Sequence, residues 1–599
     1  MENRHKSANA LPKAFIFAIL LSGINVNIAQ AADASGDVVK NTLVENTVLH
    51  RTDAIQKVES DNGNITKPKV AEIKKNNQPN RITSTLKNNT QTGRAFHWFT
   101  SDPVDNPLVL VSTKADMSQP LTFQATAREV NSHYLQRDAE GYFIYKKTKK
   151  INNNNAVIGY FTDKNKTDVK WEPEDEAKNP DESVGIDITA VKETIYDADA
   201  AGLQPGTLYY YQVGAKNGAL SDIGKFKTAG GADKAVTFIQ YTDTQNAYWN
   251  EHKRNEAQFG ADTLFQAQKV APHADFVLHT GDFVEIAEAE DEWLDLMNRS
   301  QKGFLQMSLA VVPGNHDEYG LNKKELFPKK FNEHFNLDSA GKIDGGSYYS
   351  FDYNNAHFIV LNTNDYKNKD KKALGEQQLT WLREDVQKAR KNGAKWIILS
   401  YHKPLFSKSY HSLEDEDVQN VRDDFMKAID DLDIDLALQG HDHVFSRTKS
   451  LQYASKTDSF VNAKIDHADF SYDENNHKIL RSPKGTTFVI PNTGGTKAYD
   501  SLFNESLEHI HKVRPKLNWL TQQQVEHYNN LFEIGYQPQR SARFKNKHEN
   551  YRDSSEQNFA TYTIEGNKLT GAVYQVSGDL SKGEARRVFL VDKFSIVKE

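Results

Sequence analysis

The chain has 599 residues, of which 38% are hydrophobic and 26% charged, so it is long enough for two or three soluble globular domains. Its 74 basic and 81 acidic side chains give a formal net charge of −7. The lack of a basic excess argues against nucleic acid as a dedicated partner. There is no cysteine, which excludes disulfides, thiolate metal ligands and a lipid-modified cysteine. Any metal must therefore be held by oxygen atoms and imidazole nitrogens.

Residues 1–31 are predicted to be a secretory signal peptide. Basic residues precede an apolar stretch at 14–29, and Ala29 and Ala31 supply small side chains at the cleavage positions. The apolar stretch is short for a spanning helix and contains polar residues, so no retained membrane span is expected. We therefore expect an exported protein, either periplasmic or secreted. Residues 32–90 are polar and rich in Asn and Lys, which favours a flexible linker.

Residues 91–229 are predicted to form an all-β sandwich. Phe96 and Trp98 alternate with polar neighbours, and Tyr209 and Tyr211 share one face of a later strand. The segment Leu203-Gln204-Pro205-Gly206-Thr207-Leu208-Tyr209 resembles the tyrosine corner of an immunoglobulin-like or fibronectin type III-like sandwich. Within this domain, residues 146–182 are rich in Asn, Lys and Glu and are expected to be a long surface insertion.

Residues 235–599 are predicted to form an α/β domain, because apolar strand-like runs alternate with amphipathic helices. One helix is marked by Leu379, Leu382, Val386 and Ala389, and another by Val418, Val421, Phe425 and Ile429. Three further strand-like runs, at 560–564, 569–575 and 588–597, lie near the end of the chain.

Five short polar motifs in this domain each follow an apolar run that is predicted to be a strand. The runs are Val236–Tyr241, Phe276–His279, Leu309–Val312, Trp396–Ser400 and Ile434–Leu438. The motifs are Asp243-Thr244-Gln245, Gly281-Asp282-Phe283-Val284-Glu285, Gly314-Asn315-His316-Asp317, Tyr401-His402-Lys403-Pro404 and Gly440-His441-Asp442-His443. Since α/β sheets carry their active sites at the carboxyl ends of the strands, we expect the five motifs to form one site.

These side chains are suited to holding two metal ions, which is the arrangement that phosphate ester hydrolysis requires. Asp282 is expected to bridge the two metals, with Asp243 and His443 on one metal. The other metal would be bound by Asn315, His402 and His441. His316 is not needed as a ligand, so it is expected to contact the phosphate and protonate the leaving oxygen, with Asp317 orienting it.

The constellation resembles the metallophosphoesterase (calcineurin-like) superfamily, and the preceding sandwich resembles that of its purple acid phosphatase branch. The resemblance covers roughly residues 91–599. It implies a β-sandwich flanked by helices, preceded by the immunoglobulin or fibronectin III-like domain. It also implies that His411, which follows His402 and Pro404, is a second histidine that contacts the substrate.

Two departures from the purple acid phosphatases concern one metal position. Those enzymes carry Tyr where this chain has Glu285, so the resemblance implies that the purple colour is absent. The wider superfamily carries His where this chain has Gln245. Both Gln245 and Glu285 are candidate ligands or neighbours of the ligands, and Fe, Mn and Zn all accept oxygen and nitrogen donors.

The predicted function is that of an exported, dinuclear metal-dependent phosphohydrolase acting on small phosphorylated substrates, with a metal-bound hydroxide as the nucleophile. A phosphomonoesterase of the acid phosphatase kind is the leading hypothesis. A phosphodiesterase or nucleotidase with the same site is the second. The third is a non-catalytic protein that binds the cell wall through its sandwich domain.

Overall fold

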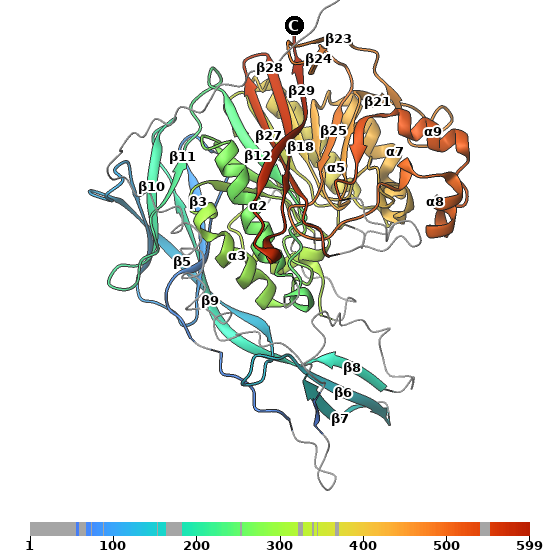
Figure 1. Cartoon of the computed structure of the whole chain (residues 1–599). Coiled ribbons are helices and arrows are strands. Elements are labelled where there is room, and N and C mark those ends of the chain that lie inside the picture. The colour runs from blue at the N-terminus through green and yellow to red at the C-terminus, as the bar shows by residue number, and fades with distance from the viewer. Residues whose placement is uncertain are drawn as a thin grey trace, which may run out of the picture.

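A computed structural model gives the architecture in Figure 1. It describes residues 56–58, 67–73, 75–87, 89–152, 154–162, 182–251, 254–321, 328–337, 341–343, 346–365, 371–539 and 552–599. The signal peptide predicted at 1–31 lies outside these ranges. In the described part of the chain, no helix is long and apolar enough to cross a membrane.

The α/β domain predicted at 235–599 contains two mixed sheets that face each other. One includes the parallel strands β12 (Val236–Tyr241), β13 (Phe276–His279) and β14 (Ser308–Val311). The other includes the parallel strands β17 (Ala356–Val360), β18 (Trp396–Ser400), β19 (Leu436–Leu438) and β25 (Thr487–Pro491). All five strands predicted before the motifs are therefore confirmed.

The second sheet is completed on both sides by antiparallel strands: β15 (Gly341–Ile343) and β16 (Gly346–Tyr353) at one end, β20 (Phe445–Thr448) and β26 (Phe532–Tyr536) at the other. The first sheet continues from β12 into β27 (Gln557–Glu565), β28 (Lys568–Ser577) and β29 (Arg587–Val597), then into β24 (Lys478–Arg481) and β23 (Asp469–Tyr472). The strands predicted near the end of the chain are thus confirmed.

Apolar side chains alternate along the strands and so build cores on both faces of each sheet. Phe238 points into the core between the sheets, whereas its neighbour Ile239 packs beneath α2 (Glu256–Val270) and α3 (Glu290–Phe304). The outer face of the second sheet is covered by α5 (Glu376–Lys391), α7 (Glu416–Asp431), α8 (Leu507–Val513) and α9 (Gln522–Asn530). The helices α5 and α7 are the two amphipathic helices that the sequence predicts.

The N-terminal domain is the expected β-sandwich. Its strands are β3 (Arg94–Thr100), β4 (Pro107–Ser112), β5 (Leu121–Leu135), β9 (Ile188–Ala200), β10 (Leu208–Ala215) and β11 (Gly224–Lys227). Phe96, Trp98 and Tyr211 are fully buried in its core. The hydroxyl of Tyr209 accepts a hydrogen bond of 2.8 Å from the backbone N–H of Gln204, which confirms the tyrosine corner.

One segment of this region differs from the sequence prediction, and the expected surface insertion contains strands. Strand β2 (Asn80–Thr85) lies inside the stretch expected to be a flexible linker, yet it pairs with β3 on one side and β14 on the other. It thereby joins the sandwich and the α/β domain into one sheet of 15 strands. The expected surface insertion contributes β6 (Ile144–Ile151), β7 (Asn154–Thr162) and β8 (Glu182–Ile186), which form a separate sheet with β1 (Gln56–Val58) and project from the body (Figure 1).

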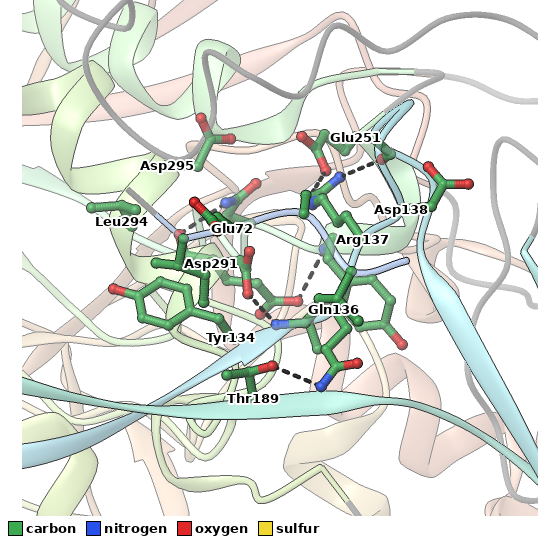
Figure 2. A pocket seen from close by; sticks show the side chains of 18 of the residues that line it. Glu72, Tyr134, Gln136, Arg137, Asp138, Thr189, Glu251, Asp291, Leu294 and Asp295 are labelled. Atoms are coloured by element: carbon green, nitrogen blue, oxygen red, sulfur yellow. Dashed lines mark hydrogen bonds and ion pairs between the residues drawn. The ribbon is translucent and has the colours of Figure 1, made fainter. Parts of the chain in front are cut away.

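The junction between the domains holds buried charge. The side chain of Arg81, on β2, is 1% exposed and forms ion pairs with Glu193 of β9 and Glu290 of α3. Beside this junction is a cavity in which Arg137 pairs with Glu251 at 2.9 Å (Figure 2). Since the contacts of Arg81 with Glu290 and of Arg137 with Glu251 cross from the sandwich to the α/β domain, they fix the two domains against each other.

Candidate metal centre

The polypeptide turns sharply where each motif leaves its strand. Asp243, Asp282 and His441 all have positive φ values, of 54°, 57° and 69°. Such backbone is uncommon for residues other than glycine and often marks functional sites. Close packing also requires Gly314, because a Cβ there would lie 2.1 Å from Oδ1 of Asp282. The turns bring the five motifs to one edge of the paired sheets.

Asp282, His402 and His441 form a buried cluster whose possible ligand atoms all lie within 4.8 Å of one another. Nε2 of His402 is 3.1 Å from Oδ2 of Asp282, and 3.3 Å from Nδ1 of His441. Three groups that can bind a metal therefore converge, as the sequence predicts.

Asp243 and His443 lie together in the same site. Nε2 of His443 is 3.4 Å from Oδ1 of Asp243, and neither side chain is exposed. The backbone N–H of His441 lies 3.1 Å from each carboxylate oxygen of Asp243. This contact ties the first motif to the fifth, although they are 198 residues apart.

Each of the three histidines has one ring nitrogen next to an outer acceptor, and its other ring nitrogen faces another candidate ligand. Nδ1 of His402 is 2.8 Å from the carbonyl of Thr280, and Nδ1 of His443 is 2.9 Å from that of Lys497. In His441 the order is reversed, because Nε2 faces Oδ2 of Asp415 at 3.2 Å. Outer acceptors of this kind fix the tautomer and orientation of metal-binding histidines. Burial and the neighbouring His411 lower the pKa of His441 well below its usual value, so its ring is neutral and suited to ligation.

Asn315 and Gln245 contribute buried amides. Within the described residues, Oδ1 of Asn315 and both amide atoms of Gln245 have no hydrogen-bond partner, and neither does Nε2 of His443. Unpaired buried polar atoms are costly unless something binds them. Amide oxygens and imidazole nitrogens are donors that metal ions accept, so the residues present fit a metal centre.

Glu285 is oriented differently from the other candidate ligands. Its Oε2 forms an ion pair with Arg552, lies 3.8 Å from Nζ of Lys497 and 3.2 Å from Nδ1 of His316. The sequence left open whether Glu285 is a ligand or a neighbour of the ligands. These contacts of its carboxylate are with two cationic side chains and an imidazole.

Asp317 does not have the expected role of orienting His316. Its carboxylate is fully buried and accepts hydrogen bonds from the backbone N–H groups of Asp282, Phe283 and Gly314, at 2.7 to 2.9 Å. The Asp317 carboxylate thus links the second motif to the third through hydrogen bonds to their backbone N–H groups. The ring of His316 is held by Glu285, whose carbonyl oxygen lies 2.8 Å from Nδ1.

A pocket of about 640 Å³ opens beside the buried cluster. Its lining includes Asn315, His316, Tyr319, Lys403, His411, Asp415, His441 and Tyr499. His411, whose Nδ1 pairs with Asp442, faces this pocket and its ring centroid is 4.2 Å from that of His441. The two predicted catalytic histidines, His316 and His411, therefore share one pocket with two of the candidate ligands, Asn315 and His441.

Sequence reasoning missed Asp415, Lys497 and Arg552. Asp415 stands in the run Glu414-Asp415-Glu416-Asp417, which is indistinguishable from a solvated helix start. Lys497 contacts His443 through its backbone carbonyl oxygen, and a backbone contact leaves no signal in the sequence. Arg552 contacts Glu285 across 267 residues of chain, so no local pattern reveals it.

A two-sheet α/β domain with carboxylates, amides and imidazoles gathered at the carboxyl ends of its strands has the metallophosphoesterase fold. Comparison with known proteins agrees. Residues 220–445 match the calcineurin-like phosphoesterase family, and residues 79–228 match the purple acid phosphatase N-terminal domain. The chain therefore contains a calcineurin-like phosphoesterase domain, preceded by the N-terminal domain of purple acid phosphatases.

The relatives are distant. An uncharacterized protein of Mycobacterium tuberculosis is 22% identical over 320 residues, which is 50% of this chain and 58% of that protein. Human acid phosphatase type 7 is 29% identical over 191 residues, or 29% of this chain and 40% of the human protein. Purple acid phosphatase 15 of Arabidopsis thaliana is 28% identical over 24% of this chain and 26% of the plant protein. The chain thus spans less than two thirds of the length of each of these three relatives.

Among solved structures, the purple acid phosphatase PPD1 from yellow lupin seeds superimposes with a TM-score of 0.53 and 15% sequence identity. The superposition covers 87% of this chain and 75% of the lupin chain. At this identity the likeness concerns the fold, and it agrees with the fold class expected from the sequence.

Proposed function

We propose that this protein is a dinuclear metal-dependent phosphohydrolase that acts as a phosphomonoesterase on small phosphorylated substrates. The observation that carries the proposal is the buried cluster of Asp282, His402 and His441, in which each histidine has one nitrogen held by an outer acceptor. Asn315 would complete this metal position. Asp243 and His443 would hold the second metal, and Asp282 would bridge the two.

Two bound metals would neutralise the phosphoryl oxygens and make water nucleophilic near neutral pH. The residues of the pocket supply the rest of the chemistry. His316 is directed by the Glu285 carbonyl at Nδ1, so Nε2 is the atom available to the substrate. As the bond from water oxygen to phosphorus forms and the ester P–O bond breaks, a proton from His316 would neutralise the leaving alkoxide.

The protonation state of His316 depends on the substrate. Burial lowers its pKa to about 4, against the opposing effect of Glu285 and Asp282, so the ring is neutral at pH 7 without substrate. A phosphate anion in the pocket adds negative charge next to the ring, which favours the protonated imidazolium. Substrate binding would therefore favour the protonated ring that the leaving group needs.

We also propose that the protein is exported, on the basis of the signal peptide predicted at residues 1–31. Its removal would leave a mature protein that begins at residue 32. N-terminal sequencing of the protein from the cell envelope and medium tests this proposal, and a retained Met1 contradicts it.

The function is tested by hydrolysis of p-nitrophenyl phosphate and its bis-ester, using protein from residue 32 that is stripped and reloaded with Mn, Zn or Fe. Metal-dependent turnover of the monoester, lost in Asp282→Asn, is the expected result. Turnover of the diester alone would replace the proposal with a phosphodiesterase. No turnover with any metal, together with binding to cell-wall polymer, would support a non-catalytic protein instead.

A further inference from the structure

Arg552 reaches from the C-terminal part of the chain into the metal-binding motifs. Its Nη1 donates to the carbonyl of Gln245 at 2.9 Å and pairs with Oε2 of Glu256 at 2.7 Å. Its Nη2 forms an ion pair with Oε2 of Glu285. One guanidinium therefore holds the first motif, the second motif and the first residue of α2. A planar fork can bridge two carboxylates in this way, and an ammonium group cannot reproduce it.

The carboxylate of Glu285 is compensated by protein groups. Arg552 and Lys497 supply positive charge on it, and the ring of His316 lies 3.2 Å from Oε2. The side chain is 5% exposed, so these contacts are only weakly screened by water. A buried carboxylate needs such partners. Glu285 already has them without a metal.

We propose that Arg552 is a positioning residue. By its ion pair it holds the Glu285 side chain so that Oε2 faces Nδ1 of His316 beside the backbone carbonyl of Glu285, and the two oxygens together direct Nε2 of His316 toward the substrate's leaving group. Glu285 then belongs to this arginine clamp, defined as Arg552, Glu285 and His316, and is not a metal ligand. The proposal rests on the proposed function for the role of His316. Its statement about Glu285 stands on the ion-pair geometry alone.

The first experiment counts metals and needs no substrate. Apo wild type, Glu285→Gln and Asp243→Asn are titrated with Zn²⁺ by calorimetry, and the metal that stays bound after dialysis is measured by mass spectrometry. Glu285→Gln should keep the wild-type stoichiometry, with a Kd within about threefold, while Asp243→Asn loses metal. Loss of one equivalent in Glu285→Gln would overturn the proposal, because it would make Glu285 a ligand.

The second experiment tests the position of His316 by comparing kcat for two esters whose leaving groups differ in their need for a proton. The nitrophenolate of p-nitrophenyl phosphate leaves without a proton, whereas the alkoxide of an alkyl phosphate needs one. Glu285→Gln and Arg552→Lys should lower kcat for the alkyl phosphate by about tenfold or more, at unchanged KM, because a misplaced acid loses most of its effect. The loss for p-nitrophenyl phosphate should stay below about threefold. Equal losses for both esters would indicate a structural role and overturn the proposal.

Arg254 provides the matched control. It also ties α2 to the C-terminal segment, through Ser554 at 3.2 Å and Asp579 at 2.8 Å, without touching Glu285. Arg254→Lys should show no leaving-group dependence, and the same selective loss in this variant would refute the assignment to Arg552. Thermal unfolding checks each variant. If Arg552→Lys does not fold, Glu285→Gln decides alone, since it removes a buried charge instead of leaving one unpaired.

The two proposals fail in different ways. If the wild type hydrolyses neither ester, the proposed function is wrong, and the role of His316 and Arg552 in leaving-group protonation is wrong with it. The metal count still decides whether Glu285 is a ligand. If the wild type hydrolyses both esters but Glu285→Gln loses a metal or shows no selectivity between esters, only the arginine clamp is refuted.

Discussion

Asp415 offers a direct test of how the structure tunes its candidate metal centre. Its Oδ2 lies 3.2 Å from Nε2 of His441, on the side of the ring opposite the Asp282 cluster. Removing such an outer carboxylate typically costs 10- to 100-fold in metal affinity. Because the Asp415 side chain is 25% exposed, water screens part of its effect. We therefore expect Asp415→Ala to lower the affinity for one of the two metals by about 10- to 30-fold, or about 1.4–2 kcal/mol of binding free energy.

The helix that follows should survive this substitution. Asp415 occupies the position before α7, but its side chain makes no capping hydrogen bond there. Asp417→Ala is a matched control, because it removes another carboxylate of the same pocket that pairs with Lys403 at 2.5 Å instead of a histidine. Circular dichroism at the start and end of the titration confirms that α7 is intact in both variants.

The assay is competition for Zn²⁺ against a chelating dye, which resolves two affinities. One of the two Zn²⁺ affinities should fall in Asp415→Ala, while both affinities should stay within about threefold of wild type in Asp417→Ala. Unchanged affinities in Asp415→Ala would refute the reasoning. Complete loss of one equivalent would refute it in another way, because His411, Asp415 and His441 also lie close enough to hold an ion themselves. Asp415 would then be a ligand.

Three further predictions concern the site, the domain junction and pH. Asp282→Asn should abolish turnover while the thermal unfolding temperature changes little; retained turnover would remove Asp282 from the metal centre. Arg81→Met leaves buried carboxylates without their cation, so urea unfolding should show a loss of about 3–5 kcal/mol, whereas Lys192→Met, at an exposed pair, should show none. Despite burial, hydrogen bonds to Asp352 and Asp385 raise the pKa of His357 to about 9. A histidine whose pKa is higher in the folded than in the unfolded state stabilises the fold fully at pH values below its unfolded pKa of about 6.5. This stabilisation is lost as the pH rises through 9. The stability gap between wild type and His357→Gln should therefore shrink from on the order of 2–3 kcal/mol at pH 6 to little at pH 10; a constant gap would contradict the ion pairs.

The elements whose pattern lies in neighbouring residues could be predicted from the sequence. Each candidate metal-binding motif follows a short apolar strand, and parallel connections bring the strand ends together, so the convergence of Asp243, Asp282 and His402 could be predicted. The amphipathic helices and the tyrosine corner also carry local patterns. These signals depend on neighbouring residues, and the structure confirms them.

The contacts that were missed are tertiary. Asp317 looks like a partner for His316, but backbone N–H groups of two motifs compete for its carboxylate, and they satisfy it in the folded chain. Strand β2 has the sequence Asn-Arg-Ile-Thr-Ser-Thr, in which only Ile82 is apolar. It is buried because strands flank it on both sides. The polar composition of the segment, which favours disorder, gives no sign of these neighbours.

Strand β2 also determines where this protein can be shortened. A variant that starts at residue 91, the predicted end of the linker, lacks the strand between β3 and β14. Two interior strands would then present unpaired backbone groups along exposed edges, which is a recognised route to aggregation between chains. The buried Glu193 and Glu290 would lose Arg81 at the same time. Recombinant protein for any of these assays should therefore retain residues 79–85, and poor solubility of shorter forms would trace to a missing strand in the middle of the sheet.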